Sequence, residues 1–173
     1  MPDDLNHADA PATHQLPFFV YGTLRKGEGN YRRYLAGKTA RELPATLPGY
    51  RLYARDLPCV VEAPGEGGVV LGDLIAVLPE RYERVLRTLD ALEGYDPAED
   101  DPWYVRVRRR VRYVAADGTP GEAEAWVYQG GRRTAASYTP ADLVPGGDWI
   151  AFYRAAGQDG DYHPDDAPAE GDE

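Results

Sequence analysis

The feature that most constrains the fold is a pair of alternating runs, residues 104–114 and 122–128, separated by the turn signal Asp117-Gly118. Alternation of apolar and polar residues is typical of strands that bury one face, and Asp-Gly favours a tight hairpin turn. The apolar positions are Val105, Val107, Val111 and Val127, and arginines interleave with them at Arg106, Arg108, Arg110 and Arg112. The runs predict an antiparallel hairpin whose arginines form a solvated face, not a nucleic-acid patch.

Further strands and one long helix are expected elsewhere. Apolar runs bounded by Gly and Pro predict strands over residues 16–21, 39–53, 60–62 and 69–78, of which 39–53 is either one bent strand or two. Gly72 indicates a bulge or a close backbone approach. After Pro79, apolar residues recur at helical spacing (Tyr82, Val85, Leu86, Leu89 and Leu92), so a helix is expected to end at Gly94.

Two smaller segments complete the expected elements. A short helix is expected over residues 31–35, and the aromatics of a last segment, residues 148–153, are expected to pack on the core. Several strands, few helices and no regular βαβ alternation predict an α+β fold. We expect a small mixed, mostly antiparallel β-barrel with one main helix and short flanking helices.

The acidity of the chain belongs to its two ends. The formal net charge is -10, but residues 1–15 and 157–173 contain no Lys or Arg and hold 3 and 7 of the 29 acidic residues, so the remaining 19 balance the 19 Lys and Arg. Both ends are rich in Pro, Ala and Asp. We therefore predict one domain over residues 16–156, flanked by disordered acidic tails over 1–15 and 157–173 that repel nucleic acid.

Cysteine and histidine usage excludes several classes of catalysis. The single Cys59 rules out an internal disulfide, suits a reducing compartment, and lies in an apolar segment typical of a core residue. All three histidines, His7, His14 and His163, lie in the predicted tails. Ser-His-Asp catalysis, Cys-His catalysis and most zinc sites are thereby excluded, and the chemistry must use carboxylates, tyrosines, hydroxyls or the backbone.

The expected cellular location follows from two kinds of segment that the sequence does not show. No apolar run approaches the roughly 20 residues of a membrane span, and the start lacks the basic-then-apolar pattern of a signal peptide. A cytoplasmic protein that does not contact a membrane is expected by default.

Two segments carry the chemistry. Tyr21-Gly22-Thr23-Leu24-Arg25 closes the first strand, and Leu89-Asp90-Ala91-Leu92-Glu93-Gly94-Tyr95 closes the long helix. A turn with outward N–H groups can hold a carboxylate, and a single Glu beside it can move protons. Each segment alone has a simpler interpretation, because such a turn is often only a turn and a Glu at a helix end is often a solvated acid.

With these residues in view, the chain resembles the γ-glutamylcyclotransferase-like family, which includes the AIG2-like proteins and the γ-glutamylamine cyclotransferases. The resemblance spans about Phe18 to Tyr153. It depends on the order and spacing of four segments: Tyr21 to Arg25 with Gly27 and Asn30 after it, Val69 with Gly72, Leu89 to Tyr95, and Tyr104-Val105-Arg106. It implies a compact mixed barrel that needs no cofactor.

The resemblance also implies a reaction and its residues. The α-amino group of a γ-glutamyl compound attacks its own γ-carbonyl carbon, giving 5-oxoproline and a free amine. The turn of Tyr21, Gly22, Thr23 and Leu24 is implied to bind the substrate carboxylate, and Glu93 is implied to be the acid/base residue. No metal is implied.

The residues themselves add two expectations about the substrate pocket. Tyr21, Tyr104 and Tyr128 are candidates for its walls, and Tyr128 is the one expected to donate a hydrogen bond. A partly buried setting would suit Glu93, because burial raises the pKa of a carboxyl group toward neutrality. Arg25 is either a second contact for the carboxylate or a solvated side chain.

Two alternatives stay open at this point. One is a non-catalytic module that binds a γ-glutamyl metabolite or a protein partner, and the other is hydrolysis of an amide by water that Glu93 activates. The amine half of the substrate depends on loops around Gly27, Pro97 and Pro140, whose positions the sequence does not define. The oligomeric state is also undefined.

Overall fold

The computed structural model describes residues 15–156, so the predicted tails, apart from Gln15, lie outside the described residues. In chain order the strands are β1 (Phe18–Val20), β2 (Thr39–Pro48), β3 (Tyr50–Ala54), β4 (Pro58–Glu62), β5 (Val69–Val77), β6 (Tyr104–Val114) and β7 (Pro120–Gly130). The helices are η1 (Tyr31–Leu35), η2 (Pro79–Arg81), α1 (Tyr82–Leu92), α2 (Arg132–Ser137), η3 (Pro140–Asp142), η4 (Pro145–Gly147) and α3 (Trp149–Ala155).

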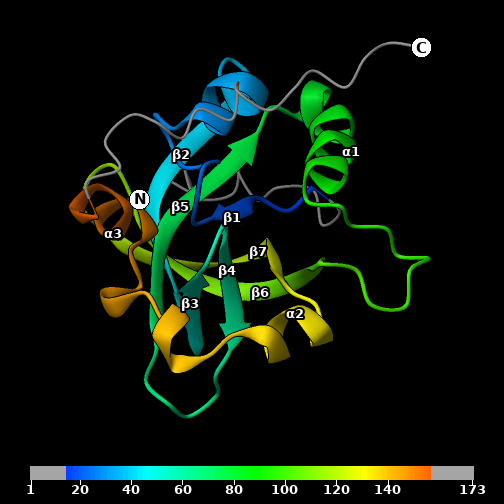
Figure 1. Ribbon diagram of the computed structural model, residues 1–173. Coiled ribbons are helices and arrows are strands. Elements are labelled where there is room, and N and C mark those ends of the chain that lie inside the picture. The colour runs from blue at the N-terminus through cyan, green and yellow to red at the C-terminus, as the bar shows by residue number, and fades with distance from the viewer. Residues whose placement is uncertain (1–14, 157–173) are drawn as a thin grey trace.

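Five strands close into a barrel in the order β1-β5-β2-β6-β7 (Figure 1). Four of the five pairings are antiparallel, and the parallel pairing of β1 with β7 closes the ring where Phe18 lies opposite Trp126. The Trp126 N–H donates to the Pro17 carbonyl at 2.8 Å at this seam. The predicted fold class, a mostly antiparallel mixed barrel with one main helix and short flanking helices, is confirmed.

The predicted hairpin is formed by β6 and β7. It runs without a break from Tyr104 opposite Gly130 to Val114 opposite Pro120. The Ala115 N–H donates to the Thr119 carbonyl at 2.8 Å, which closes the turn. Val111 is buried on the face of the pleat that covers the core, and Arg108, Arg110 and Arg112 are exposed on the other face as predicted. Arg106 differs from the prediction, because it is mostly buried against Trp126. β7 extends two residues beyond the predicted run at each end.

The segment predicted as one bent strand or two is two strands. Gly49 separates β2 from β3 with φ of +79°, a left-handed conformation that only glycine adopts readily. β3 pairs with β4, and β4 joins β7 through a parallel bridge between Val60 and Gln129. This extension beyond the barrel brings the start of β4 beside the end of β7.

A close backbone approach occurs at Gly72, as predicted. A Cβ atom at this position would lie 2.3 Å from the Val20 carbonyl oxygen, so only glycine lets β1 and β5 pack at this spacing. The sheet irregularity lies in β2 between Thr39 and Arg41, not at Gly72. β1 is shorter than predicted, since pairing with β5 begins at Phe18 and the chain turns after Val20.

The helix α1 buries the predicted stripe. Tyr82, Val85 and Leu89 face the core, and the Tyr82 hydroxyl donates to the Leu16 carbonyl at 2.6 Å. Gly94, with φ of +62°, ends the helix in the expected left-handed conformation. The last turn of α1 therefore lies at a fixed position against the barrel, on the side of β1 (Figure 1).

The C-terminal third differs from the prediction in two places. The helix α2 was not predicted, and its N-terminal N–H groups at Arg132 and Arg133 are accepted by the Asp101 carboxylate at 2.8 and 3.1 Å. In α3, Trp149 is buried with Tyr153 stacked on it, but Phe152 is 41% exposed, so the prediction that all its aromatics pack inward is wrong.

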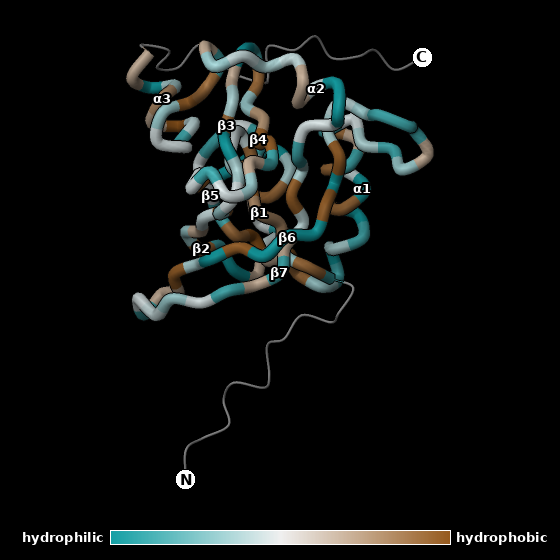
Figure 2. Tube along the Cα trace, turned by 90° about the horizontal axis from the view of Figure 1, so that it is seen from below, coloured by the Kyte–Doolittle hydropathy of each residue, from teal (hydrophilic) through white to brown (hydrophobic). Residues whose placement is uncertain are grey.

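The hydrophobic segments lie toward the middle of the molecule and the hydrophilic segments lie along its loops and edges (Figure 2). The buried residues form two clusters, one around Phe19, Leu47 and Val127 and one around Phe18, Ile75 and Leu89. Among residues 15–156, no helix is both long and apolar enough to cross a bilayer.

Candidate active site

A cavity of about 270 Å³ opens where the end of β1, the end of α1, the start of β6 and the end of β7 meet. All seven site residues predicted from the sequence line it: Tyr21, Gly22, Thr23, Leu24, Glu93, Tyr104 and Tyr128. They come from four segments far apart in the chain. The barrel therefore brings together a turn, a carboxylate and three phenols that the sequence keeps up to 107 residues apart.

The turn after β1 offers unpaired donors. The Arg25 N–H donates to the Gly22 carbonyl at 3.0 Å, and the Tyr31 N–H donates to the Thr23 carbonyl at 3.1 Å, so the turn is fixed by its own carbonyls. Within the described chain, no acceptor takes the N–H groups of Gly22, Thr23 or Leu24. Such a run of free backbone N–H groups is suited to an anion.

Two side chains support this turn. The Asn30 amide donates to the Thr23 hydroxyl oxygen at 2.7 Å, which leaves the hydroxyl proton of Thr23 free to point elsewhere. Pro58 packs against Gly22, where a Cβ atom would lie 2.7 Å from the proline Cγ. Glycine at position 22 is thus required by the close approach of β4.

Arg25 lies behind the turn and is not among the residues that line this cavity. Its Nη1 donates to the Asp148 carboxylate at 3.2 Å, and its Nε lies 3.6 Å from the Asp73 carboxylate. Asp73 also accepts the Lys26 N–H at 2.9 Å. Arg25 therefore ties the turn to β5 and to the start of α3, which differs from both roles considered for it from the sequence.

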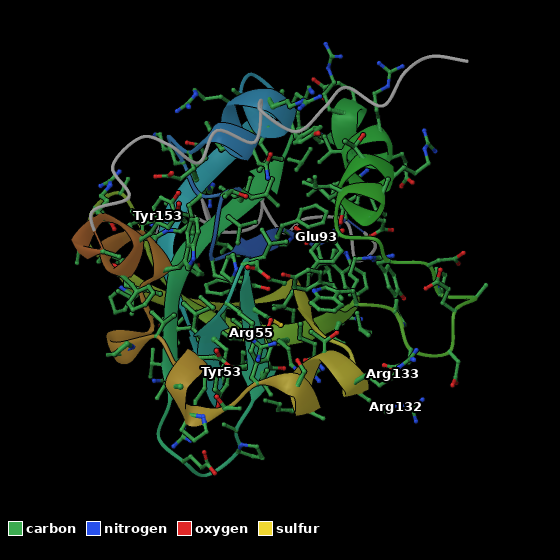
Figure 3. The ribbon with its side chains drawn as sticks, in the orientation of Figure 1. Tyr53, Arg55, Glu93, Arg132, Arg133 and Tyr153 are labelled. Carbon is green, nitrogen blue, oxygen red and sulfur yellow. The ribbon has the colours of Figure 1, made fainter. Side chains whose placement is uncertain are left out.

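Glu93 follows α1 directly and is the C-cap residue, held by a hydrogen bond from its N–H to the Leu89 carbonyl at 3.0 Å. It lies at the end of α1 beside β1 (Figure 3). Within residues 15–156, no hydrogen bond or ion pair reaches its carboxylate, and burial raises the pKa of this carboxyl to about 7. A carboxyl group with this pKa can both accept and donate a proton near neutrality.

The three phenols direct their protons into the protein. Tyr21 donates to the Tyr128 carbonyl at 2.6 Å, Tyr104 donates to the Pro58 carbonyl at 2.7 Å, and Tyr128 donates to the Asp90 carboxylate at 2.6 Å. Burial raises the pKa of all three hydroxyls, so they stay protonated. Tyr128, which the sequence suggested as a donor to substrate, donates to Asp90 in the structure.

The rim of the cavity contains residues that the sequence did not identify. Arg33, Tyr34, Leu57, Pro58 and Leu92 line it together with Asn30. The expected loops around Pro97 and Pro140 do not contribute lining residues. Nothing in the sequence pointed to Leu57 and Pro58, because they reach the site only through the pairing of β4 with β7.

A second cavity and the single cysteine are weaker candidates for a catalytic site. The second cavity, of about 430 Å³, lies between β2, β5 and the β6–β7 hairpin, and its one carboxylate, Glu122, is half exposed and lies beside Arg110 and Arg112. Cys59 is fully buried, and burial raises the pKa of its thiol to about 12. Its thiol is thus a core group, as predicted, and not a nucleophile.

Comparison with known proteins agrees with this arrangement. Residues 18–151 match the family described as gamma-glutamyl cyclotransferase, AIG2-like. The gamma-glutamylaminecyclotransferase of Bos taurus is 34% identical over 131 residues, which cover 72% of this chain and 68% of the bovine protein.

Solved structures show the same architecture. An AIG2-like protein of Mus musculus superposes with a TM-score of 0.56 at 25% identity, covering 79% of this chain and 88% of the mouse chain. An uncharacterized protein of Pyrococcus horikoshii, at 20% identity, shares the fold with a TM-score of 0.51 over 84% of this chain and 98% of its own. The family match includes both the turn after β1 and the end of α1, and the chain belongs to the AIG2-like gamma-glutamyl cyclotransferase family.

Proposed function

We propose that this protein is a cofactor-independent, cytoplasmic γ-glutamylcyclotransferase that converts a γ-glutamyl amine or γ-glutamyl amino acid to 5-oxoproline and a free amine. One observation carries the proposal: the unpartnered Glu93 carboxyl, with its pKa raised to about 7, shares a cavity with the free N–H groups of Gly22, Thr23 and Leu24. The turn supplies a binding site for an anion, and Glu93 supplies the proton carrier.

The substrate carboxylate is bound by the turn. Its oxygens accept from the free N–H groups of residues 22–24, and the Thr23 hydroxyl, held on its other side by Asn30, is a further donor. The γ-glutamyl chain then bends back on itself inside the cavity. This orientation is the larger part of catalysis, because a well-placed intramolecular attack contributes about 7–11 kcal/mol.

Glu93 transfers protons from the attacking nitrogen to the departing one. It takes a proton from the α-ammonium group, and the freed amine nitrogen forms a bond to the γ-carbonyl carbon. The protonated Glu93 then donates to the departing nitrogen as the original amide C–N bond breaks. The attacking nitrogen loses a second proton by the same route, so the products are the five-membered lactam and the amine as its ammonium ion, and Glu93 returns to its starting charge. Such proton transfer contributes about 10²–10⁴-fold in rate.

The amine half of the substrate leaves through the rim of Asn30, Arg33, Tyr34 and Leu57. The bovine relative is named for γ-glutamyl amines, which supports this class as the first to test. The substrate is small, and nucleic acid and membranes have no part in the reaction.

The experiment is a mass-spectrometric screen of the full chain against a panel of γ-glutamyl amines and γ-glutamyl amino acids, scoring 5-oxoproline. Glu93→Gln is the test variant, and Glu83→Gln, on the exposed first turn of the same helix, is the matched control. We expect product from the wild type and the control only. Full activity in Glu93→Gln would overturn the role of Glu93.

Two further outcomes separate the alternatives. Tight binding of a γ-glutamyl compound that is released unchanged would show a binding module in place of an enzyme. In water labelled with oxygen-18, label in a glutamate product would show hydrolysis, whereas cyclisation gives unlabelled 5-oxoproline.

A further inference from the structure

Asp90 lies one helical turn before Glu93 on α1, but it does not line the cavity. Residues three apart on a helix lie on the same side, so Asp90 is directly behind the site. Its carboxylate Oδ1 accepts the hydroxyl proton of Tyr128 at 2.6 Å. Tyr128 does line the cavity, so one side chain connects Asp90 to the space where substrate binds.

Arg106 fixes Asp90 from the other side. Its Nε lies 2.9 Å from the same Oδ1 atom, and both side chains are mostly buried, with 17% of Arg106 and 21% of Asp90 exposed. The Arg106 guanidinium lies over the Trp126 ring, 4.3 Å from its centre, and over the Tyr95 ring at 5.4 Å. Contacts with two rings restrict the movement of this guanidinium, which pairs with the Asp90 carboxylate while that carboxylate accepts the Tyr128 proton.

The consequence for Tyr128 is a fixed direction of its hydroxyl group. A phenol has one proton and two acceptor lone pairs, and here the proton is donated to Asp90. The oxygen can therefore meet a ligand in the cavity only as an acceptor. The Tyr21 and Tyr104 hydroxyls also donate into the protein, so these three phenols offer acceptors to the cavity while the turn offers donors.

This division matches the two charged ends of an α-amino acid, with the carboxylate on the turn and the ammonium group near the phenols and Glu93. We propose that Asp90 is a positioning residue that, held by Arg106, directs the Tyr128 hydroxyl so that its oxygen accepts an N–H of the substrate α-amino group. The proposal rests on the proposed function. With one N–H held by Tyr128, the amine cannot rotate freely about its Cα–N bond while Glu93 takes another proton.

The test variants are Asp90→Asn and Tyr128→Phe. Asn is isosteric with Asp, but its amide N–H₂ can donate to Tyr128 and so release the phenol proton toward the cavity. We expect each variant to lower kcat/KM about tenfold or more, the range of a hydrogen bond to a charged group. The double variant is expected to lose no more than the larger single loss, because Asp90 acts through Tyr128.

A second readout separates positioning from structural damage. An N-alkyl glutaramate has the carboxylate and the γ-amide of the substrate but no α-amino group, so it binds without cyclising. We expect Asp90→Asn to raise KM for the γ-glutamyl substrate several-fold and to leave the inhibition constant of the glutaramate within about twofold, since its loss concerns the amine alone. Equal weakening of both ligands, or additive losses in the double variant, would overturn the proposal.

The outcome is distinguishable from failure of the proposed function. A wild-type protein that cyclises no γ-glutamyl compound contradicts the function itself, whereas an active wild type with an unchanged Asp90→Asn variant contradicts only the role of Asp90. If Asp90→Asn does not fold, Tyr128→Phe gives the same ligand comparison with the Asp90–Arg106 pair retained. Equal effects on both ligands in Tyr128→Phe then count against the proposal.

Discussion

The carboxylates on the outer face of the β6–β7 hairpin and the carboxylate at the end of α1 have opposite surroundings. Glu122 and Glu124 are half exposed, and each lies beside an arginine of β6, with Glu124 2.5 Å from Arg108. Glu93 lies on the wall of a cavity, and within the described chain no cation pairs with it. The hairpin gives its acids a cationic partner and high exposure, whereas Glu93 is partly buried and has no cationic partner among the described residues.

The two environments favour different protonation states of a carboxyl group. A nearby cation stabilises the charged form of a carboxylate, so a paired acid cannot easily hold a proton at neutral pH. Burial without a partner has the opposite effect, and it raises the pKa of Glu93 to about 7. The comparison predicts large functional effects at Glu93 and small ones on the hairpin.

The largest effect is expected from Glu93→Gln. Glutamine has nearly the same shape but cannot carry the proton, so kcat/KM for 5-oxoproline formation is expected to fall about 10²–10⁴-fold. Glu124→Gln on the hairpin is the matched control, and its rate is expected to equal that of the wild type. Steady-state kinetics on one purified substrate measure both, and similar losses in the two variants would remove the distinction between the regions.

The pH profile sharpens the same point. In the proposed mechanism the charged form of Glu93 is the base, so kcat/KM is expected to rise with pH and level off above an apparent pKa of about 7. A glutamate in a model peptide has a pKa of about 4.3, so a base of that kind would reach full activity at much lower pH. If kcat/KM rises only below pH 5 and is constant above it, Glu93 is not the titrating base.

As pH rises, the free energy of unfolding of the wild type is expected to fall while its kcat/KM rises. The Glu93 carboxyl titrates near 4.5 when unfolded and about 7 when folded, so between these values the folded chain holds a proton that the unfolded chain has lost. Wild-type stability therefore falls as pH rises through this window, by up to about 3 kcal/mol, and stays lower above it.

Glu93→Gln lacks this penalty. Its free energy of unfolding in urea is expected to exceed that of the wild type at pH 8, and the difference is expected to shrink toward pH 5. Glu83→Gln is the control, and the difference between its free energy of unfolding and that of the wild type is expected to stay constant between pH 5 and pH 8. A Glu93→Gln variant no more stable than wild type at pH 8 would mean that the folded carboxyl is well solvated.

Most of the fold was predictable because its signals are local. The valine and arginine alternation gave the β6–β7 hairpin, Gly49 marked the break between β2 and β3, and the apolar spacing after Pro79 gave α1. The helix α2 was missed, because its stability depends on Asp101 accepting N–H groups from a distant segment. No pattern within residues 132–137 carries that information.

The candidate site was also predictable only where its signals are local. The turn and Glu93 are identifiable from short motifs, and the structure brings them to one cavity. The direction of the Tyr128 proton and the part played by Pro58 depend on contacts between segments 38 and 46 residues apart. Such pairings are tertiary, so residue types alone could not reveal them.

A moderate effect is expected at the turn from Gly22→Ala. The new Cβ would lie 2.7 Å from the Pro58 ring, so the turn or the start of β4 must shift. Displacing the donors raises KM for the γ-glutamyl substrate about tenfold or more, since a hydrogen bond to a charged group contributes about 1.5–3 kcal/mol. Substitution of the open Gly27 by Asn, which tolerates its positive φ, is the control expected to leave KM unchanged.

The smallest effect is expected on the hairpin. Arg108 and Glu124 are close, with one guanidinium nitrogen 2.5 Å from a carboxylate oxygen, yet both side chains are 51% exposed. Exposed pairs contribute about 0.2–1 kcal/mol because water and salt screen them. A double-mutant cycle with Arg108→Ala and Glu124→Ala, followed by urea unfolding, is expected to give a coupling in that range that shrinks further in 1 M salt. A coupling of several kcal/mol would show that this exposed ion pair stabilises the fold strongly. The small effects expected on the hairpin would then be wrong, and the contrast with Glu93 would be lost.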